Sequence, residues 1–118
     1  MPKPERESDI ERYFDHRVKE TGGETRKMRW IGRAHAPDRF AFWPSLHELA
    51  ARGAFVELKR PGEPPRSGQV RERDRLWRAG FDALIIDSRE AVDRLVALYG
   101  LSPLELAYNK ENENAKSV

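Results

Sequence analysis

Near the start of the chain, hydrophobic residues recur at the spacing of an amphipathic helix: Ile10, Tyr13, Phe14 and Val18. Residues three or four positions apart lie on one face of a helix, so this stripe predicts a helix with one buried face. Ser8, followed three residues later by Glu11, has the pattern of a capping box, which places the start of the helix near Ser8. Gly22-Gly23 predicts where it ends.

Two further segments have helical spacing, and a short helix is expected after them. The first segment is Ser67–Ala79, and the second is a helix that Ser88 caps and that ends at Gly100. The short terminal helix opens at Ser102-Pro103. The segments with strand character are Glu24–Ile31, Arg39–Trp43, Ala54–Lys59 and Ala83–Ile86. The last is wholly apolar, which is typical of a strand buried on both faces. The order helix, three strands, helix, strand, helix predicts a single α/β structure.

The predicted domain spans residues 8–108 of a chain of 118 residues, which is the usual size of one domain. We expect residues 1–7 to be flexible and residues 109–118 to be disordered, and we interpret Ser45–Gly53 as an insertion that can hold a helical turn. The chain has no cysteine, which excludes disulfides, thiolate metal sites and a cysteine nucleophile. It has no signal peptide and no apolar run of membrane length, so we expect a cytoplasmic protein without a membrane partner.

Basic residues are concentrated in two segments, although the net charge is only +2. Between Arg26 and Arg39 there are five basic residues and one acidic residue, and between Lys59 and Arg78 there are seven basic and three acidic residues. Such clusters suit a polyanion. A solvated, highly charged surface gives the same pattern, so charge alone leaves both interpretations open.

The segment Phe55–Lys59 carries the clearest candidate chemistry. Side chains alternate along a strand, so Glu57 and Lys59 share one face. If the preceding strand pairs with this one in an antiparallel hairpin, Asp38 lies near both. Two neighbouring carboxylates make a hard oxygen site for Mg²⁺ or Mn²⁺. The simpler alternatives are that Asp38 is a turn residue and that Glu57 and Lys59 lie on an exposed edge strand.

Pro37-Asp38 followed by Glu57-Leu58-Lys59 has the form of the PD-(D/E)XK motif of a large nuclease superfamily. Over about residues 8–97 the chain resembles one branch of it, the virus-type replication-repair nuclease (VRR-NUC) family. The residues that carry the resemblance are Glu11, Gly22-Gly23, Lys27, Pro37-Asp38-Arg39, Phe55–Lys59, Pro61-Gly62, Gln69 and Ile86-Asp87-Ser88. The resemblance implies a restriction-endonuclease-like α/β fold with a mixed sheet flanked by helices.

The resemblance also implies roles for individual residues. Asp38 and Glu57 would bind the metal together with the backbone carbonyl of Leu58, and Lys59 would be the catalytic lysine. Glu11 and Gln69 would complete the site from the two flanking helices, and Glu11 is a further candidate metal ligand. Without the resemblance, the simpler interpretation of Glu11 is a capping residue, and the sequence gives no reason to assign a role to Gln69. Family membership further implies structure-selective DNA cleavage, a homodimer and branched substrates such as Holliday junctions.

Several other residues have weaker signals. The candidate phosphate contacts are Lys27, Arg39, Arg66 and Arg73. Trp30, Trp43 and Trp77 are expected in the core, with base-stacking platforms as the alternative. The chain departs from many relatives at His35, where they have glycine, and in the insertion Ser45–Gly53. His35 is either a loop residue or a participant in the site, whereas His16 and His47 are expected on the surface.

We therefore predict a Mg²⁺- or Mn²⁺-dependent DNA endonuclease that acts in phage replication or repair. One alternative is a DNA-junction-binding or replication-complex module of the same fold without catalysis, in which the acidic pair is only structural. Another is a different phosphodiesterase or a nuclease that acts on RNA. Binding that falls with salt but ignores chelators would indicate the module, whereas turnover that needs a divalent ion would indicate the enzyme.

Overall fold

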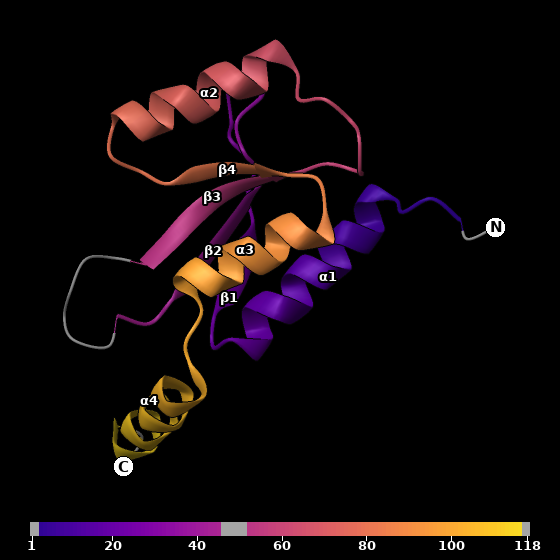
Figure 1. Ribbon diagram of the computed structural model, residues 1–118. Helices are drawn as coiled ribbons and strands as arrows, with labels where there is room; N and C mark the ends of the chain where they lie inside the picture. Colours follow the sequence, from indigo (N-terminus) through magenta and orange to yellow (C-terminus); the bar gives the residue numbers. More distant parts are fainter. Residues whose placement is uncertain (1–2, 46–51, 117–118) are drawn as a thin grey trace.

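The structure is a computed structural model that describes residues 3–45 and 52–116. Its helices and strands follow the order α1 (Glu7–Glu20), β1 (Glu24–Lys27), β2 (Arg39–Trp43), β3 (Arg52–Leu58), α2 (Ser67–Arg78), β4 (Ala83–Ile86), α3 (Arg89–Tyr99) and α4 (Pro103–Lys116). The predicted α/β order is confirmed (Figure 1). Among the described residues, no helix is long and apolar enough to cross a membrane.

The four strands form one mixed sheet in the order β1-β2-β3-β4. The first three are antiparallel neighbours, while β4 runs parallel to β3. The strand predicted for Glu24–Ile31 ends at Lys27, because the chain leaves the sheet and enters a long loop that returns at Asp38. In β4, Leu84 and Ile85 are only partly buried. The prediction of a strand covered on both faces is therefore wrong, since β4 lies at the edge of the sheet.

Helix α1 begins one residue earlier than predicted, and its cap differs. The Arg6 backbone N–H donates to Asp9 Oδ2 at 2.9 Å, so Asp9 takes the place expected for Glu11. Ser8 lies inside the helix. The predicted capping box of Ser8 and Glu11 is therefore wrong, and the Glu11 carboxylate is available for other contacts.

The core lies between one face of the sheet and the pair α1 and α3. Helix α1 contributes Ile10, Phe14 and Val18, which are fully buried. Sheet and α3 residues complete the cluster: Ala41, Trp43, Ala54, Val56, Leu58, Ile86, Val92, Leu95 and Val96. The buried positions of β2 and β3 alternate with half-buried ones, as expected for strands with one face on the core.

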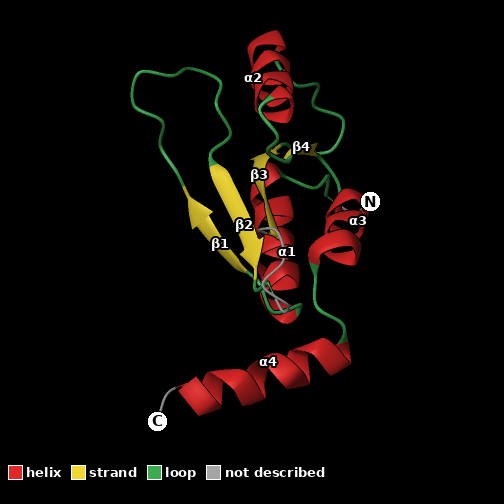
Figure 2. Ribbon diagram, turned by 90° about the vertical axis from the view of Figure 1, so that its left-hand side faces the viewer, coloured by secondary structure: helices red, strands yellow, loops and turns green. Residues whose placement is uncertain are grey.

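The opposite face of the sheet is aromatic and largely open. Figure 2 shows α1 behind β1 and β2 and no described helix in front of them. The Phe40 ring stacks on Phe42 at 5.7 Å and contacts Phe55 at 5.0 Å between ring centroids. Helix α2 lies beside β4 and away from α1 and α3, and its Trp77 Nε1 donates to the Ala83 carbonyl at 2.6 Å (Figure 1). Trp43 is in the core as predicted, but Trp30 and Trp77 are 36% and 48% exposed.

Two elements at the end of the chain show how caps set helix length. Ser88 accepts from the Ala91 N–H at 3.1 Å and caps α3 as predicted. The Ser102 hydroxyl accepts from the Glu105 N–H and the Glu105 carboxylate accepts from the Ser102 N–H, which forms a capping box for α4. The helix then continues to Lys116. Residues 109–116, where we expected disorder, therefore lie within α4, and the disorder of the tail stays a prediction.

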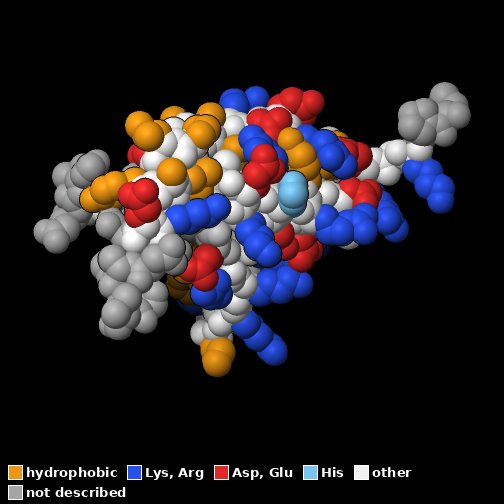
Figure 3. All heavy atoms as spheres, turned by 90° about the horizontal axis from the view of Figure 1, so that it is seen from below, with side chains coloured by type: hydrophobic (Ala, Val, Ile, Leu, Met, Phe, Trp, Pro, Cys, Tyr) orange, Lys and Arg blue, Asp and Glu red, His pale blue; other side chains and the backbone are white. Residues whose placement is uncertain are grey.

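The predicted insertion lies mostly outside the described residues, since residues 46–51, including His47, are not described. Arg52 and Gly53, its last two residues, are the first two of β3. Seen from the side of α4, the surface carries interspersed basic and acidic side chains, and hydrophobic side chains gather toward one side (Figure 3).

Gly23 sits where a side chain has no room. A Cβ built there would lie 2.6 Å from Trp43 Nε1 and 2.8 Å from Val18 Cγ1. Gly23→Ala should therefore lower the free energy of unfolding by about 1–3 kcal/mol through overpacking, measured by urea denaturation. Gly62→Ala is the control, because it has open space and only a positive φ of 79° to oppose it. Equal losses in the two variants would contradict this packing.

Candidate functional site

The pairing of β2 with β3 brings Asp38 and Glu57 together. Arg39 is the register partner of Val56, so the preceding residue of β2 and the following residue of β3 face one another. The negative charge of Asp38 raises the pKa of the Glu57 carboxyl group, and the Asp38 backbone lowers it, so the two residues act on one another at short range. The two carboxylates predicted to share a site are therefore neighbours.

The surroundings of Glu57 destabilise the ionised form of its carboxyl group. Burial is the main cause that raises its pKa to about 7, and the nearby Asp38 charge adds to the rise. Lys59 and the Asp38 backbone lower the pKa but do not offset the increase. Such a strongly shifted carboxylate beside a second one is typical of functional sites. A smaller upward contribution comes from Glu7 at the start of α1.

Gln69 contacts Glu57 directly. Its Nε2 donates to Glu57 Oε1 at 2.9 Å, while its own Oε1 accepts from the Arg66 backbone N–H at 2.8 Å. The second bond is the cap of α2, so the orientation of the Gln69 amide is set by the helix that carries it. The structure thus brings Gln69 to the carboxylate pair.

Lys59 follows directly after β3, and its side chain is only 7% exposed. Its backbone N–H donates to Ile86 O at 2.8 Å, which continues the pairing with β4. Its Nζ lies 3.3 Å from Glu63 Oε1. Glu63, four residues further along the chain, thus holds the Lys59 ammonium group near Glu57. The sequence pattern did not predict this role of Glu63.

Glu11 lies in a different contact network. Its carboxylate forms ion pairs with Arg39 Nη2 at 2.8 Å and with Lys27 Nζ at 3.2 Å. Burial raises the pKa of Glu11, but Lys27 and Arg39 more than offset this and leave the pKa below its ordinary value. Glu11 is therefore ionised and already paired, and it reaches Asp38 only through Arg39.

Arg39 links the two networks. It is 7% exposed, and its Nη1 lies 3.2 Å from both Asp38 Oδ2 and the Asp38 carbonyl oxygen. Its Nε is buried without a hydrogen-bond partner among the described residues. The Arg39 guanidinium is thus largely buried and paired with Glu11 and Asp38, and its role as a phosphate contact stays a prediction.

The other predicted site residues are placed as follows. The Leu58 side chain is in the core, between Glu57 and Lys59. Lys27 is well exposed apart from its pair with Glu11. Arg66 is exposed at the start of α2, and Arg73 pairs with Asp74 on the same helix. Within the described ranges, no three His, Cys, Asp or Glu side chains are grouped so as to hold a metal ion.

The loop that leads to Asp38 is fastened to α2. Arg33 and Arg75 both pair with Glu72, whose side chain is 11% exposed. His35 has a φ of +66° and packs on Gly68, where a Cβ would come within 2.4 Å of its Cδ2. His35 therefore forms part of the contact between loop and helix, and this contact sets Asp38 relative to Gln69.

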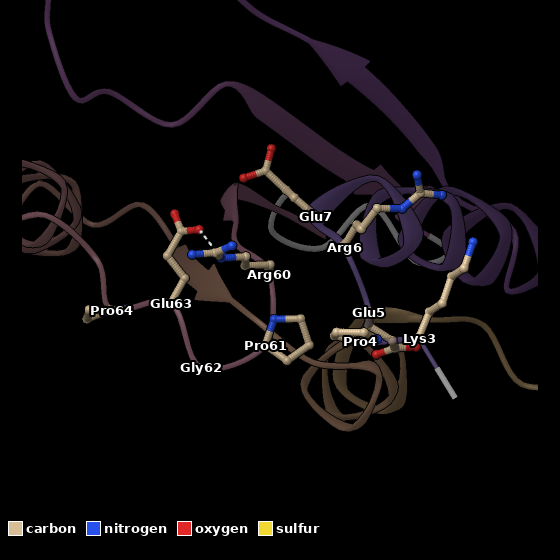
Figure 4. A pocket seen from close by; sticks show the side chains of 10 residues that line it. All are labelled: Lys3, Pro4, Glu5, Arg6, Glu7, Arg60, Pro61, Gly62, Glu63 and Pro64. Atoms are coloured by element: carbon tan, nitrogen blue, oxygen red, sulfur yellow. Dashed lines mark ion pairs between the residues drawn. The ribbon is translucent and has the colours of Figure 1, made fainter. Parts of the chain in front are cut away.

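A cleft borders the site on the side of the N-terminal segment. Figure 4 shows its walls, formed by residues 3–7 and residues 60–64. Within the second wall, Arg60 Nε lies 3.1 Å from Glu63 Oε2, and Glu63 is also the partner of Lys59. Asp38 and Glu57 do not line the cleft, which adjoins the site through Glu63, the partner of Lys59, and through Glu7, whose charge acts weakly on Glu57. The helical spacing of Glu7 and Glu11, four residues apart on α1, was the only sequence signal for Glu7.

Two carboxylates, a buried lysine and an amide carried by α2 thus lie together where the sequence predicted the site. A protein from Acyrthosiphon pisum secondary endosymbiont phage 1, named "Putative nuclease p44", is 34% identical over 93 residues, which are 79% of this chain and 95% of that protein. A solved structure described as a VRR_NUC domain superposes with a TM-score of 0.67 and 30% identity over 79% of this chain and 96% of that one. No family model matches the chain. The chain belongs to the VRR-NUC family of nucleases.

The shifted pKa of Glu57 predicts an effect on stability in the absence of divalent ions. With a pKa near 7 when folded and 4.5 as the ordinary value, the folded state holds the proton more tightly. The free energy of unfolding should thus fall as the pH rises from about 4.5 to 7. Glu57→Gln removes this loss and should stabilise the protein at pH 8 in chelator by on the order of 2 kcal/mol.

The measurement is urea denaturation at pH 5 and pH 8, with Glu20→Gln as the control because Glu20 is exposed and distant from the pair. The same pH dependence in wild type and Glu57→Gln would contradict the assignment.

Proposed function

We propose that this chain is a metal-dependent DNA endonuclease that hydrolyses phosphodiester bonds. The carrying observation is that Asp38 and Glu57 lie side by side although their charges repel, and that Glu57 is partly buried. Such a pair has a free-energy cost, since the burial of Glu57 and the nearby charge of Asp38 both destabilise the ionised form of Glu57. A divalent cation relieves this cost by binding between them.

The donor set fits Mg²⁺ or Mn²⁺. Both ions prefer oxygen ligands, and a site with one or two carboxylates leaves positions for water and phosphate oxygens. We propose Asp38, Glu57 and the backbone carbonyl of Leu58 as ligands. When bound, the ion polarises the phosphoryl oxygen and lowers the pKa of a bound water.

Lys59 and Gln69 provide the remaining chemistry. The Lys59 ammonium is nearly buried, so its charge acts with little screening on an oxygen that gains negative charge during hydrolysis. Gln69 orients Glu57 through its hydrogen bond, which leaves the second carboxylate oxygen free to face a ligand. We propose Lys59 as the catalytic lysine and Gln69 as a positioning residue.

For Glu11, the contacts favour a positioning role over metal ligation. Its two basic partners satisfy its charge, and through Arg39 it fixes the side chain of Asp38. Glu7 is the better candidate for a carboxylate that reaches the site from α1, because its charge already acts on Glu57.

We propose DNA as the substrate and structured or branched DNA as its preferred form. Exposed basic side chains border the site and can contact phosphates: Lys3, Arg6, Lys27, Arg60, Arg66 and Arg73. The described residues form one such site, so two opposed strands would be cut by a homodimer. The relative named after a phage nuclease supports a role in phage replication or repair, carried out in the host cytoplasm by a domain of residues 8–108.

Cleavage should depend on each member of the site. Asp38→Asn, Glu57→Gln and Lys59→Ala should each lower the cleavage rate at least about 100-fold, since each removes a charge that stabilises the transition state. The measurement is cleavage of labelled linear, nicked, flapped and four-way-junction DNA with Mg²⁺, with Mn²⁺ and with chelator. An RNA substrate is included to test the alternative nucleic acid.

The control is Glu20→Gln, an exposed carboxylate on α1 that the account leaves out of the site. Circular dichroism establishes that the variants are folded. Wild-type rates in any of the three site variants, or cutting that persists in chelator, would contradict the proposal. Binding without cutting would favour a DNA-binding module.

A further inference from the structure

A groove opens on the aromatic face of the sheet. Its walls are Met28, Arg29, Trp30, Ile31 and Phe55. Trp30 is 36% exposed and Ile31 is 94% exposed, so the apolar walls are not part of the core. The ring centroids of Trp30 and Phe55 are 5.7 Å apart with planes inclined at 60°. Exposed apolar side chains grouped beside a polar site are typical of a binding surface.

The groove is tied to the backbone that carries the two carboxylates. Trp30 Nε1 donates to the Pro37 carbonyl at 2.6 Å, and Pro37 directly precedes Asp38. Phe55 lies on the same face of β3 as Glu57, and two residues along a strand span about 6.6 Å. A ligand in the groove would therefore lie next to the proposed cleavage site. It would contact Trp30, whose position is fixed by its hydrogen bond to Pro37.

The charges of the groove select the kind of ligand. Arg29 is exposed and forms no hydrogen bond or ion pair with the described residues, and no acidic residue lines the groove. Further along the same face, the Arg26 guanidinium lies over the Phe42 ring at 5.2 Å. Aromatic rings interspersed with arginines are the features that bind single-stranded nucleic acid by stacking and by phosphate contacts.

A second copy of the chain fits this surface less well. Two-fold pairing places the same patch against itself, which would bring the two Arg29 side chains close together without an acidic partner in the groove. The observations therefore favour a polyanion with flat apolar bases.

We infer that the groove binds an unpaired nucleobase of the substrate, stacked on Trp30, with an adjoining phosphate on Arg29. The inference rests on the proposed nuclease function and names its substrate class: DNA with unpaired nucleotides beside the scissile bond. A base inside a duplex is stacked between its neighbours and must leave the stack to enter a protein groove. The groove thus gives a physical reason for preferring gapped or branched DNA over intact duplex.

Binding of fluorescently labelled DNA in chelator tests the inference without requiring cleavage. The probes are a duplex with a three-nucleotide gap and the intact duplex of the same sequence, and the readout is fluorescence anisotropy. Trp30→Ala should weaken binding to the gapped DNA by about 5- to 150-fold, the range for loss of one stacked base, with a smaller effect on the duplex. Trp30→Phe keeps an aromatic ring and should restore most of the affinity.

Two further variants address charge and folding. Arg29→Ala should weaken binding to the gapped DNA more than Arg12→Ala, which removes an equal charge from α1. Ile31→Glu should also remove the preference, and because Ile31 is almost fully exposed, it tests the groove even if Trp30→Ala fails to fold.

Three results would overturn the inference. The first is equal affinity of the wild type for gapped and intact DNA. The second is an equal loss in Trp30→Phe and Trp30→Ala, which would assign Trp30 only the hydrogen bond to Pro37. The third is a change of oligomeric state in Ile31→Glu by analytical ultracentrifugation, which would make the groove a self-interface. Cleavage with Mg²⁺ is measured separately, so a failed nuclease assignment is distinguishable from a failed groove.

Discussion

The repulsion between Asp38 and Glu57 is the constraint on which the rest of the site depends. The antiparallel register of β2 and β3 places the two residues opposite one another, and the partial burial of Glu57 weakens the screening of its charge by water, although the Asp38 side chain is 54% exposed. An isolated pair of this kind would separate or take up a proton, as the pKa of Glu57 near 7 reflects. The pair persists because each carboxylate is held by its own set of neighbours.

Each set belongs to a different part of the fold. Asp38 is held by Arg39 and, through it, by Glu11 on α1, while its loop is fastened to α2 by Glu72. Glu57 is held by Gln69, which the cap of α2 orients. The helices on both sides of the sheet therefore converge on one pair of side chains.

Much of this arrangement follows from local sequence. Strand alternation places Glu57 on the face opposite the core, the hairpin brings Asp38 to it, and the apolar stripe of α1 predicts the helix that covers the sheet. The predictions are wrong where contacts in the folded structure determine the position of a side chain. Asp9 displaces Glu11 as the capping residue, and Glu11 instead pairs with Arg39, which is buried because it serves two carboxylates. Trp30 leaves the predicted strand because its ring and N–H find partners on the open face. No spacing rule identifies the pairing of Glu11 with Arg39 or of Trp30 with Phe55, since each joins residues far apart in the chain.

The central claim is that the strained carboxylate pair is a cation site. Crystals grown with Mn²⁺ and measured at a wavelength where manganese scatters anomalously test it most directly. The account predicts an anomalous peak between Asp38 and Glu57, within bonding distance of an oxygen from each, and loss of the peak in Glu57→Gln. A peak elsewhere, or none in crystals of the wild-type protein, would contradict it.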